Sequence, residues 1–223
     1  MALTITNDAV LTWLWQTNYW LGVGAEDHGW VAGTQGWCAA GSVADLEANA
    51  SNYYHFLMWT GSVTTATNPL SISVSRPYSV VATFGENLAT HATPQWWLVA
   101  NGLTNDSWDV MALADTDADG MRNWQEWVAG TDPTNGQSLL SISQVVFTAS
   151  GRLPLSFDSV AGRTYQVWLS SSLVETNWSR APHSSTEEGA LNTDAIAGSG
   201  APVTTFVQPD GTANFYRVGV QKE

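Results

Sequence analysis

The stretch HFLMWTGSVTTATNPLSISVSRPYSVVATF, residues 55–84, carries the clearest indication of the fold. Both of its ends are rich in β-branched and aromatic residues, which favour strands. In its last run, Val80, Ala82 and Phe84 recur with the period of two that is typical of a half-buried strand. We therefore expect strands here, with the turn of the first run near Gly61.

The residues before this stretch continue the β pattern. LTWLWQTNYWLGVGA (11–25) contains aromatic and β-branched residues without helical spacing, and repeated glycines mark turns or bulges after it. SVADLEANA (42–50) fits either a short helix or a pair of strands. Residues 1–85 are therefore expected to form one β domain.

The order of several short motifs in this segment resembles a known family. GW (36–37), then an Ala/Val-rich strand, YHF, WTG, NPL and a closing Ala-x-Phe together resemble the divergent bacterial repeat related to internalin-type B-repeats, over residues 12–84. The resemblance implies a small β-grasp-like domain of bacterial surface and secreted proteins, without catalytic residues. The aromatic residue that usually follows GW is replaced by Cys38, which we expect to be a small buried hydrophobe.

Residues 86–137 are predicted to be a helical connector. Thr93 before Pro94 predicts a helix start, with Thr93 as N-cap, and Gly102 predicts its end. NWQEWVAG places Trp124 and Trp127 at helical spacing before a terminating glycine.

Residues 138–223 are predicted to return to strands and form a β-sandwich. LLSISQVVF, LPLSFDS, RTYQVWLSS, VTTFVQ and NFYRVGV are separated by turn signals. Tyr165, Val167 and Leu169 are expected on one face. The segment resembles a sandwich module found at the C-terminus of exported bacterial proteins. The whole chain is thus expected to be mainly β: a β-grasp-like repeat, a small helical connector and a β-sandwich.

The connector contains a metal-binding pattern, DTDADGMRNWQE (115–126). Acidic and amide side chains fall at positions 1, 3, 5, 9 and 12 of a twelve-residue EF-hand loop, with glycine at position 6. Oxygen ligands at this spacing favour calcium over magnesium or zinc. The expected ligands are Asp115, Asp117, Asp119, the Met121 carbonyl, Asn123 and Glu126.

The calcium loop is predicted to be a structural clamp and not a sensor. Arg122 occupies position 8, where a paired EF-hand has an aliphatic residue, and the loop occurs once. With the following GTDPTN it resembles the solitary loops of bacterial exported proteins and thrombospondin type 3 repeats, in which Asp132 or Asn135 is a candidate outer ligand.

The acidic composition and the predicted calcium site both bear on where the protein is expected to be located. Twenty acidic residues oppose seven basic ones, and the net charge of −13 argues against nucleic-acid partners and against anionic membranes. No apolar run is long enough for a membrane span. A weak calcium clamp requires millimolar calcium, so we expect an extracellular or cell-surface location, with the export signal upstream of Met1.

Enzymatic chemistry has little support in the sequence. No nucleophile-elbow, P-loop or dinucleotide pattern occurs, and the four histidines are scattered. The many tryptophans are expected to fill small cores and joints, although Trp13 and Trp15, on one face of a predicted strand, could stack on a sugar ring.

Three functions are weighed. The first is a non-enzymatic, calcium-stabilised module for adhesion, surface display or assembly, including self-association. The second is an accessory carbohydrate-binding region of a larger polysaccharide-degrading enzyme. The third, an autonomous hydrolase, has the least support, because a cleft is rare in modules of this size.

Overall fold

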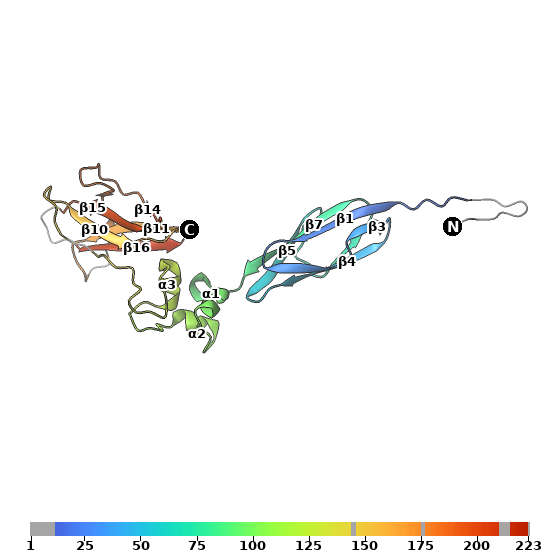
Figure 1. The fold of residues 1–223 in the computed structure, drawn as a ribbon, viewed down its shortest axis with the longest axis horizontal. Helices are drawn as coiled ribbons and strands as arrows, with labels where there is room; N and C mark the ends of the chain where they lie inside the picture. The colour runs from blue at the N-terminus through green and yellow to red at the C-terminus, as the bar shows by residue number, and fades with distance from the viewer. Residues whose placement is uncertain (1–11, 144–145, 175–176, 210–214, 223) are drawn as a thin grey trace, which may run out of the picture. The chain divides into compact units, whose positions relative to one another are not determined.

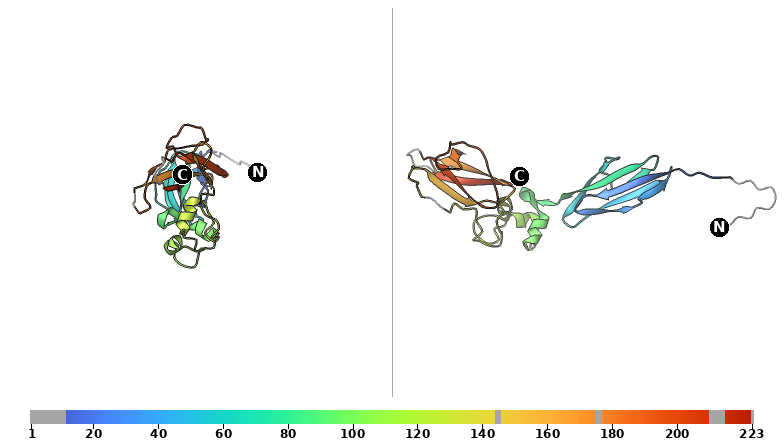
Figure 2. Two further views of the ribbon diagram at one scale, coloured as in Figure 1. Left: turned by 90° about the vertical axis from the view of Figure 1, so that its left-hand side faces the viewer. Right: turned by 45° about the horizontal axis from the view of Figure 1, so that its top comes forward.

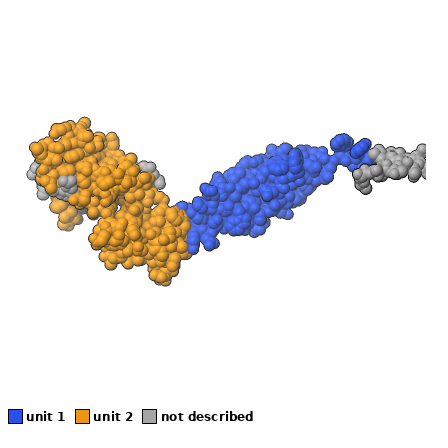
Figure 3. Space-filling view, in the orientation of Figure 1, with its two compact units in different colours: residues 1–87 blue, residues 88–223 orange. Residues whose placement is uncertain are grey.

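Strands form most of the regular structure in the computed structural model, which describes residues 12–143, 146–174, 177–209 and 215–222 (Figure 1). The predicted mainly β class with a small helical part is confirmed. The chain divides into two compact units, residues 1–87 (unit 1) and 88–223 (unit 2), shown in Figure 3. The helices lie in the same unit as the C-terminal strands, so the division predicted at residue 137 falls inside unit 2.

Unit 1 consists of two sheets. One has the strand order β3-β1-β7-β5 and the other β2-β4-β6; within the first, β1 and β7 run parallel. Figure 2 shows them from two further directions. The strands are β1 (Asn18–Ala25), β2 (Gly29–Gly33), β3 (Gly36–Ala39), β4 (Val43–Ala50), β5 (Tyr54–Gly61), β6 (Leu70–Ser73) and β7 (Tyr78–Glu86).

One hydrophobic core joins the two sheets of unit 1. Alternate residues of each strand enter it, among them Leu21 from β1, Leu46 from β4 and Val80 from β7. Trp59 is fully buried, and its indole nitrogen donates a hydrogen bond to the Thr67 carbonyl at 3.1 Å. Cys38 is buried, as predicted.

The structure corrects three details of unit 1. SVADLEANA is a strand, because Ala44, Leu46 and Ala48 alternate toward the core. The described residues of unit 1 form no helix, so the β-grasp likeness does not extend to a helix packed on the sheet; β2-β4-β6 shares the core instead. The first strand begins at Asn18, so residues 12–17 precede it.

The helical part of unit 2 consists of short elements. They are β8 (Leu88–Ala89), the 3-10 helix η1 (Thr90–Ala92), β9 (Thr93–Pro94), α1 (Gln95–Ala100), α2 (Trp108–Leu113) and α3 (Asn123–Ala129). Helix α1 is capped by Pro94, not by Thr93, whose hydroxyl donates to the Thr90 carbonyl; the predicted start was one residue too early. None of the helices in the described ranges is long and apolar enough to span a membrane.

Tryptophans fill this helical part, as predicted. Trp127 is buried, with the ring centroids of Trp96 and Trp97 at 5.6 and 5.4 Å. Trp124 stacks on His91 at 4.1 Å. The predicted stripe of Trp124 and Trp127 thus faces neighbouring aromatic rings, and α3 ends at Gly130 in the left-handed conformation, as expected.

The C-terminal strands form two further sheets around a second core. The orders are β10-β15-β13 and β12-β11-β14, with β16 on the free side of β11, and both sheets contribute to one hydrophobic cluster. Tyr165 and Val167 are buried on one face of β11, as predicted. The strands are β10 (Leu153–Asp158), β11 (Arg163–Ser170), β12 (Ser179–Arg180), β13 (His183–Ser184), β14 (Ile196–Ala197), β15 (Pro202–Val207) and β16 (Phe215–Lys222).

The strand predicted at LLSISQVVF is wrong for the described residues 139–143 and 146–147, which belong to no strand. Ser143 donates one backbone hydrogen bond to Ser156 of β10, at 2.7 Å, and no ladder is assigned there. Residues 144 and 145 lie outside the described ranges.

Candidate metal centre

The acidic loop connects α2 to α3. The Asn123 backbone nitrogen donates to the Ala114 carbonyl at 2.8 Å, which joins the two ends of the loop. Between them the chain reverses at Gly120, whose φ of +98° is a conformation that glycine adopts without steric cost. The position-6 glycine of the pattern therefore has its predicted role.

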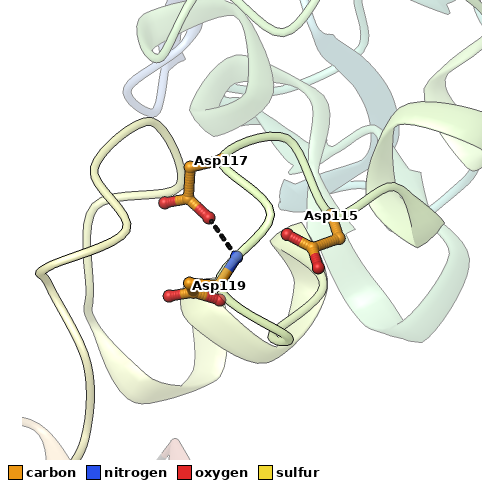
Figure 4. A group of neighbouring side chains, drawn as sticks. All are labelled: Asp115, Asp117 and Asp119. Atoms are coloured by element: carbon orange, nitrogen blue, oxygen red, sulfur yellow. Dashed lines mark hydrogen bonds between the residues drawn. The ribbon is translucent and has the colours of Figure 1, made fainter.

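Asp115, Asp117 and Asp119 converge, as Figure 4 shows, and each offers an oxygen within 4.8 Å of the others. Each carboxylate also accepts one backbone hydrogen bond inside the loop. Asp117 accepts from the Asp119 nitrogen at 3.3 Å, Asp119 from the Met121 nitrogen at 2.6 Å, and Asp115 from the Gly120 nitrogen at 3.0 Å. These bonds fix the side chains and leave one oxygen of each free.

Glu126 brings a buried carboxylate from the first turns of α3. Its side chain is 0% exposed, and Thr131 donates to one oxygen at 3.3 Å. Burial, and then the charges of Asp117 and Asp119, raise the pKa of Glu126 to about 7. A carboxylate held here without a counter-charge destabilises the folded chain.

Buried oxygens without a partner surround this point. Among the described residues, Oδ2 of Asp117, Oδ2 of Asp119, Oε2 of Glu126 and Oδ1 of Asn123 are buried and accept no hydrogen bond. Buried polar atoms are nearly always paired. Four orphaned oxygens in one loop therefore fit a site that is completed by a cation.

The donor set fits a hard divalent cation. Carboxylate and amide oxygens are the ligands that calcium takes, six to eight at a time, whereas zinc favours nitrogen and sulfur. Asn123 has its amide nitrogen fixed by Met111 O at 2.6 Å and Thr116 Oγ1 at 2.9 Å, which leaves its oxygen as the acceptor. The Met121 carbonyl stays a predicted ligand.

The candidate outer ligands Asp132 and Asn135 make hydrogen bonds within the turn that follows α3, and a ligand role for either stays a prediction. One oxygen of Asp132 accepts from the Thr134 nitrogen at 3.0 Å and from its hydroxyl at 2.7 Å. These bonds lower the pKa of Asp132. Asn135 accepts from the Gln137 nitrogen at 3.2 Å. The two residues thus build the turn that follows α3.

Two contacts were missed by the sequence reasoning. Thr131, in the GTDPTN motif, holds Glu126, and Gly136, just after the motif, lies over the loop. A side-chain carbon on Gly136 would lie 3.5 Å from the Asp117 carbonyl oxygen and from Asp119 Cβ. The available signal was the position of GTDPTN directly after the acidic loop, because Thr131 lies within this motif and Gly136 follows it.

Arg163 of β11 fastens the metal loop to the C-terminal sheets. This buried guanidinium donates to the carbonyls of Trp127, at 2.8 Å, and Val128, at 2.5 Å, near the end of α3. Those carbonyls lack partners within the helix, so Arg163 satisfies them and complements the negative end of the helix dipole. The position of Glu126 is therefore tied to β11.

The predicted glycan-stacking residues lie outside any strand. Trp13 and Trp15 are 77% and 94% exposed in the irregular residues before β1. They do not fill a core within the described structure, and stacking on a sugar stays a prediction. Trp20 of β1 and Trp37 of β3 form a different exposed pair: they are cross-strand neighbours with ring centroids 5.6 Å apart.

Comparison with known proteins supports part of these assignments. Residues 19–88 match the family model of the divergent InlB B-repeat domain, which confirms the resemblance predicted for residues 12–84. That family is typical of surface proteins. Searches of the curated proteins and of the solved structures gave no match. The calcium loop and the C-terminal module remain predictions from residues and geometry.

Proposed function

We propose that the chain is a non-enzymatic, calcium-stabilised module of an exported bacterial protein that serves adhesion, surface display or assembly. The B-repeat match supports the surface setting. The calcium part rests on Glu126, which is fully buried with an unpartnered oxygen beside three converging aspartates. Calcium at extracellular concentration neutralises this cluster and holds the loop closed.

Thermal unfolding with and without calcium tests the clamp. The double variant Asp115→Ala, Glu126→Gln removes two of the predicted ligands, and we expect it to abolish the rise in melting temperature that calcium gives to the wild-type chain. Glu188→Gln, which changes an exposed acid outside the loop, is the matched control. A wild-type melting temperature that is the same in calcium and in chelator contradicts the proposal.

Carbohydrate binding is the second candidate function, as the accessory region of a larger polysaccharide-degrading enzyme. The observation that favours it is the pair Trp20 and Trp37, which are 50% and 73% exposed on one face of a rigid sheet. Glycines 22 and 36 add no side chain over Trp20. Flat aromatic rings held in this way stack on sugar rings.

Glycan-array binding separates the two candidates. Trp20→Ala and Trp37→Ala are expected to abolish glycan binding, whereas Trp30→Ala, an exposed tryptophan of the other sheet, leaves it unchanged. Loss of binding in Trp13→Ala or Trp15→Ala instead assigns stacking to the segment before β1. Self-association of the chain without glycan affinity favours assembly.

A further inference from the structure

A recess lies on the polar face of the sheet formed by β12, β11 and β16. We call it the Trp168 recess; it has a volume of about 390 Å³, and it is lined by Gln166, Trp168, Arg180, Arg217, Gly219 and Gln221, among others. The strand register brings three of these lining residues side by side. Trp168 is paired with Arg180 on one neighbouring strand and with Arg217 on the other. Directly paired residues point to the same face, so the indole lies between two guanidinium groups.

Gly219 lets the indole of Trp168 pack against β16. It is paired with Gln166, next to Trp168 along the same face. A side-chain carbon at residue 219 would lie 3.0 Å from the indole nitrogen of Trp168. A larger residue at this position would therefore displace the indole, so the glycine sets the position of the ring in the recess.

The recess is positively charged in a strongly acidic protein. The chain carries 20 acidic and 7 basic residues, yet the described lining of the recess contains two arginines and no Asp or Glu. Arg217 is held in place by tryptophan, since its guanidinium carbon lies 4.2 Å from the Trp178 ring centroid and 5.9 Å from that of Trp168. A guanidinium stacked in this way keeps its N–H edge available for a planar anion.

The lining selects among anions. Two guanidinium groups bind a carboxylate through paired N–H donors. The amides of Gln166 and Gln221 both donate and accept, as sugar hydroxyls do, and the Trp168 ring offers a flat apolar surface. An acidic peptide also offers carboxylates to the two guanidinium groups, but it lacks the ring hydroxyls that would pair with both glutamines.

We propose that the Trp168 recess binds a carboxylate-bearing sugar, that is, a uronic acid residue of an acidic polysaccharide. The carboxylate binds the guanidinium groups of Arg180 and Arg217 over the Trp168 indole, the sugar ring packs against that indole, and the glutamines bind hydroxyl groups. The site is separate from the calcium loop and from the Trp20–Trp37 pair. It goes beyond the proposed function, because it gives unit 2 a ligand of defined chemistry.

Calorimetric titration of the full chain with trigalacturonate, at one fixed calcium concentration, tests the proposal. We expect binding to weaken about tenfold or more when the carboxylates are methyl-esterified and in Arg217→Gln or Arg180→Gln, because each change removes charged hydrogen bonds. Gly219→Val is expected to abolish binding by displacing the Trp168 indole. Arg76→Gln, which removes the same charge from unit 1, leaves the affinity unchanged.

Three results with the wild-type chain overturn the proposal. They are absence of trigalacturonate binding to the wild-type chain, equal affinity for the acid and its methyl ester, and equal or tighter binding of a tri-glutamate peptide. Circular dichroism of each variant checks that the sheet is intact; if Gly219→Val is misfolded, the two arginine variants and the ester decide the outcome. Trigalacturonate binding that survives in the Arg217→Gln, Arg180→Gln double variant also contradicts it.

Discussion

At the scale of the residue, Glu126 predicts how the metal-free protein responds to pH. Its pKa is about 7 in the folded chain, against 4.5 for a glutamate side chain in water. Between these values the folded state retains a proton that the unfolded state has released, so stability falls as pH rises through this window. Urea unfolding in chelator should therefore show a less stable chain at pH 7.5 than at pH 5, and Glu126→Gln should flatten the difference.

Calcium should act on the same residue in the opposite direction. A protonated Glu126 must release its proton before it can bind a cation, so calcium affinity is expected to rise with pH up to about 7 and then level off. A stability that increases from pH 5 to pH 7.5 in chelator would contradict the buried, unneutralised carboxylate described here.

The loop backbone gives a second prediction for single residues. Gly120→Ala places a side chain at a φ of +98° and should cost about 1–2 kcal/mol, whereas Ala118→Gly relieves an alanine at a φ of +62° and should not destabilise the chain. Both positions are open to solvent, so packing is unchanged. Chemical denaturation measures the two; a greater loss in Ala118→Gly would contradict the assigned backbone.

At the scale of the element, Arg163 is expected to stabilise α3 and the metal loop together. Arg163→Met leaves the Trp127 and Val128 carbonyls without their donor and should cost about 1–3 kcal/mol, with weaker calcium binding. Arg180→Met, which changes an exposed arginine of β12 outside the loop, is the control. Urea unfolding and calcium titration measure both effects, and equal losses in the two variants would refute the anchoring.

The elements also show how much the sequence could predict. YSVVATF was predictable because its alternation is local, and the convergence of the three aspartates was predictable because they follow one another at fixed spacing. LLSISQVVF is as apolar as a strand, but its described residues make one backbone hydrogen bond to the edge of β10, from Ser143 to Ser156, and no continuous pairing follows from it. No sequence pattern indicated that Arg163 contacts the end of α3, because its carbonyl partners lie about 35 residues earlier in the chain.

In residues 42–50 the sequence pattern indicated a strand but did not exclude a helix. The buried positions Ala44, Leu46 and Ala48 have a period of two, but alanine is small and common in helices, so the pattern was ambiguous. The opposite error occurred at residues 12–17, where aromatic content alone suggested a strand. Strand propensity depends on what a side chain packs against, which composition does not reveal.

At the scale of the whole molecule, chelation should affect the two units unequally. Unit 1 has its own hydrophobic core and none of the acidic cluster, whereas the loop belongs to unit 2. Hydrogen exchange in chelator is expected to increase in residues 114–136 and to remain unchanged in β1, β5 and β7. Increased exchange in these three strands would mean that the clamp also stabilises unit 1.

The parallel pairing of β1 with β7 has a mechanical consequence. These are the first and last strands of unit 1, and they are joined by a register that runs from Leu21–Tyr78 to Ala25–Ala82. A pull on the two ends of unit 1 therefore loads these hydrogen bonds in shear, all at once, instead of opening them one after another as in a hairpin. This geometry resists tension applied to the two ends of unit 1.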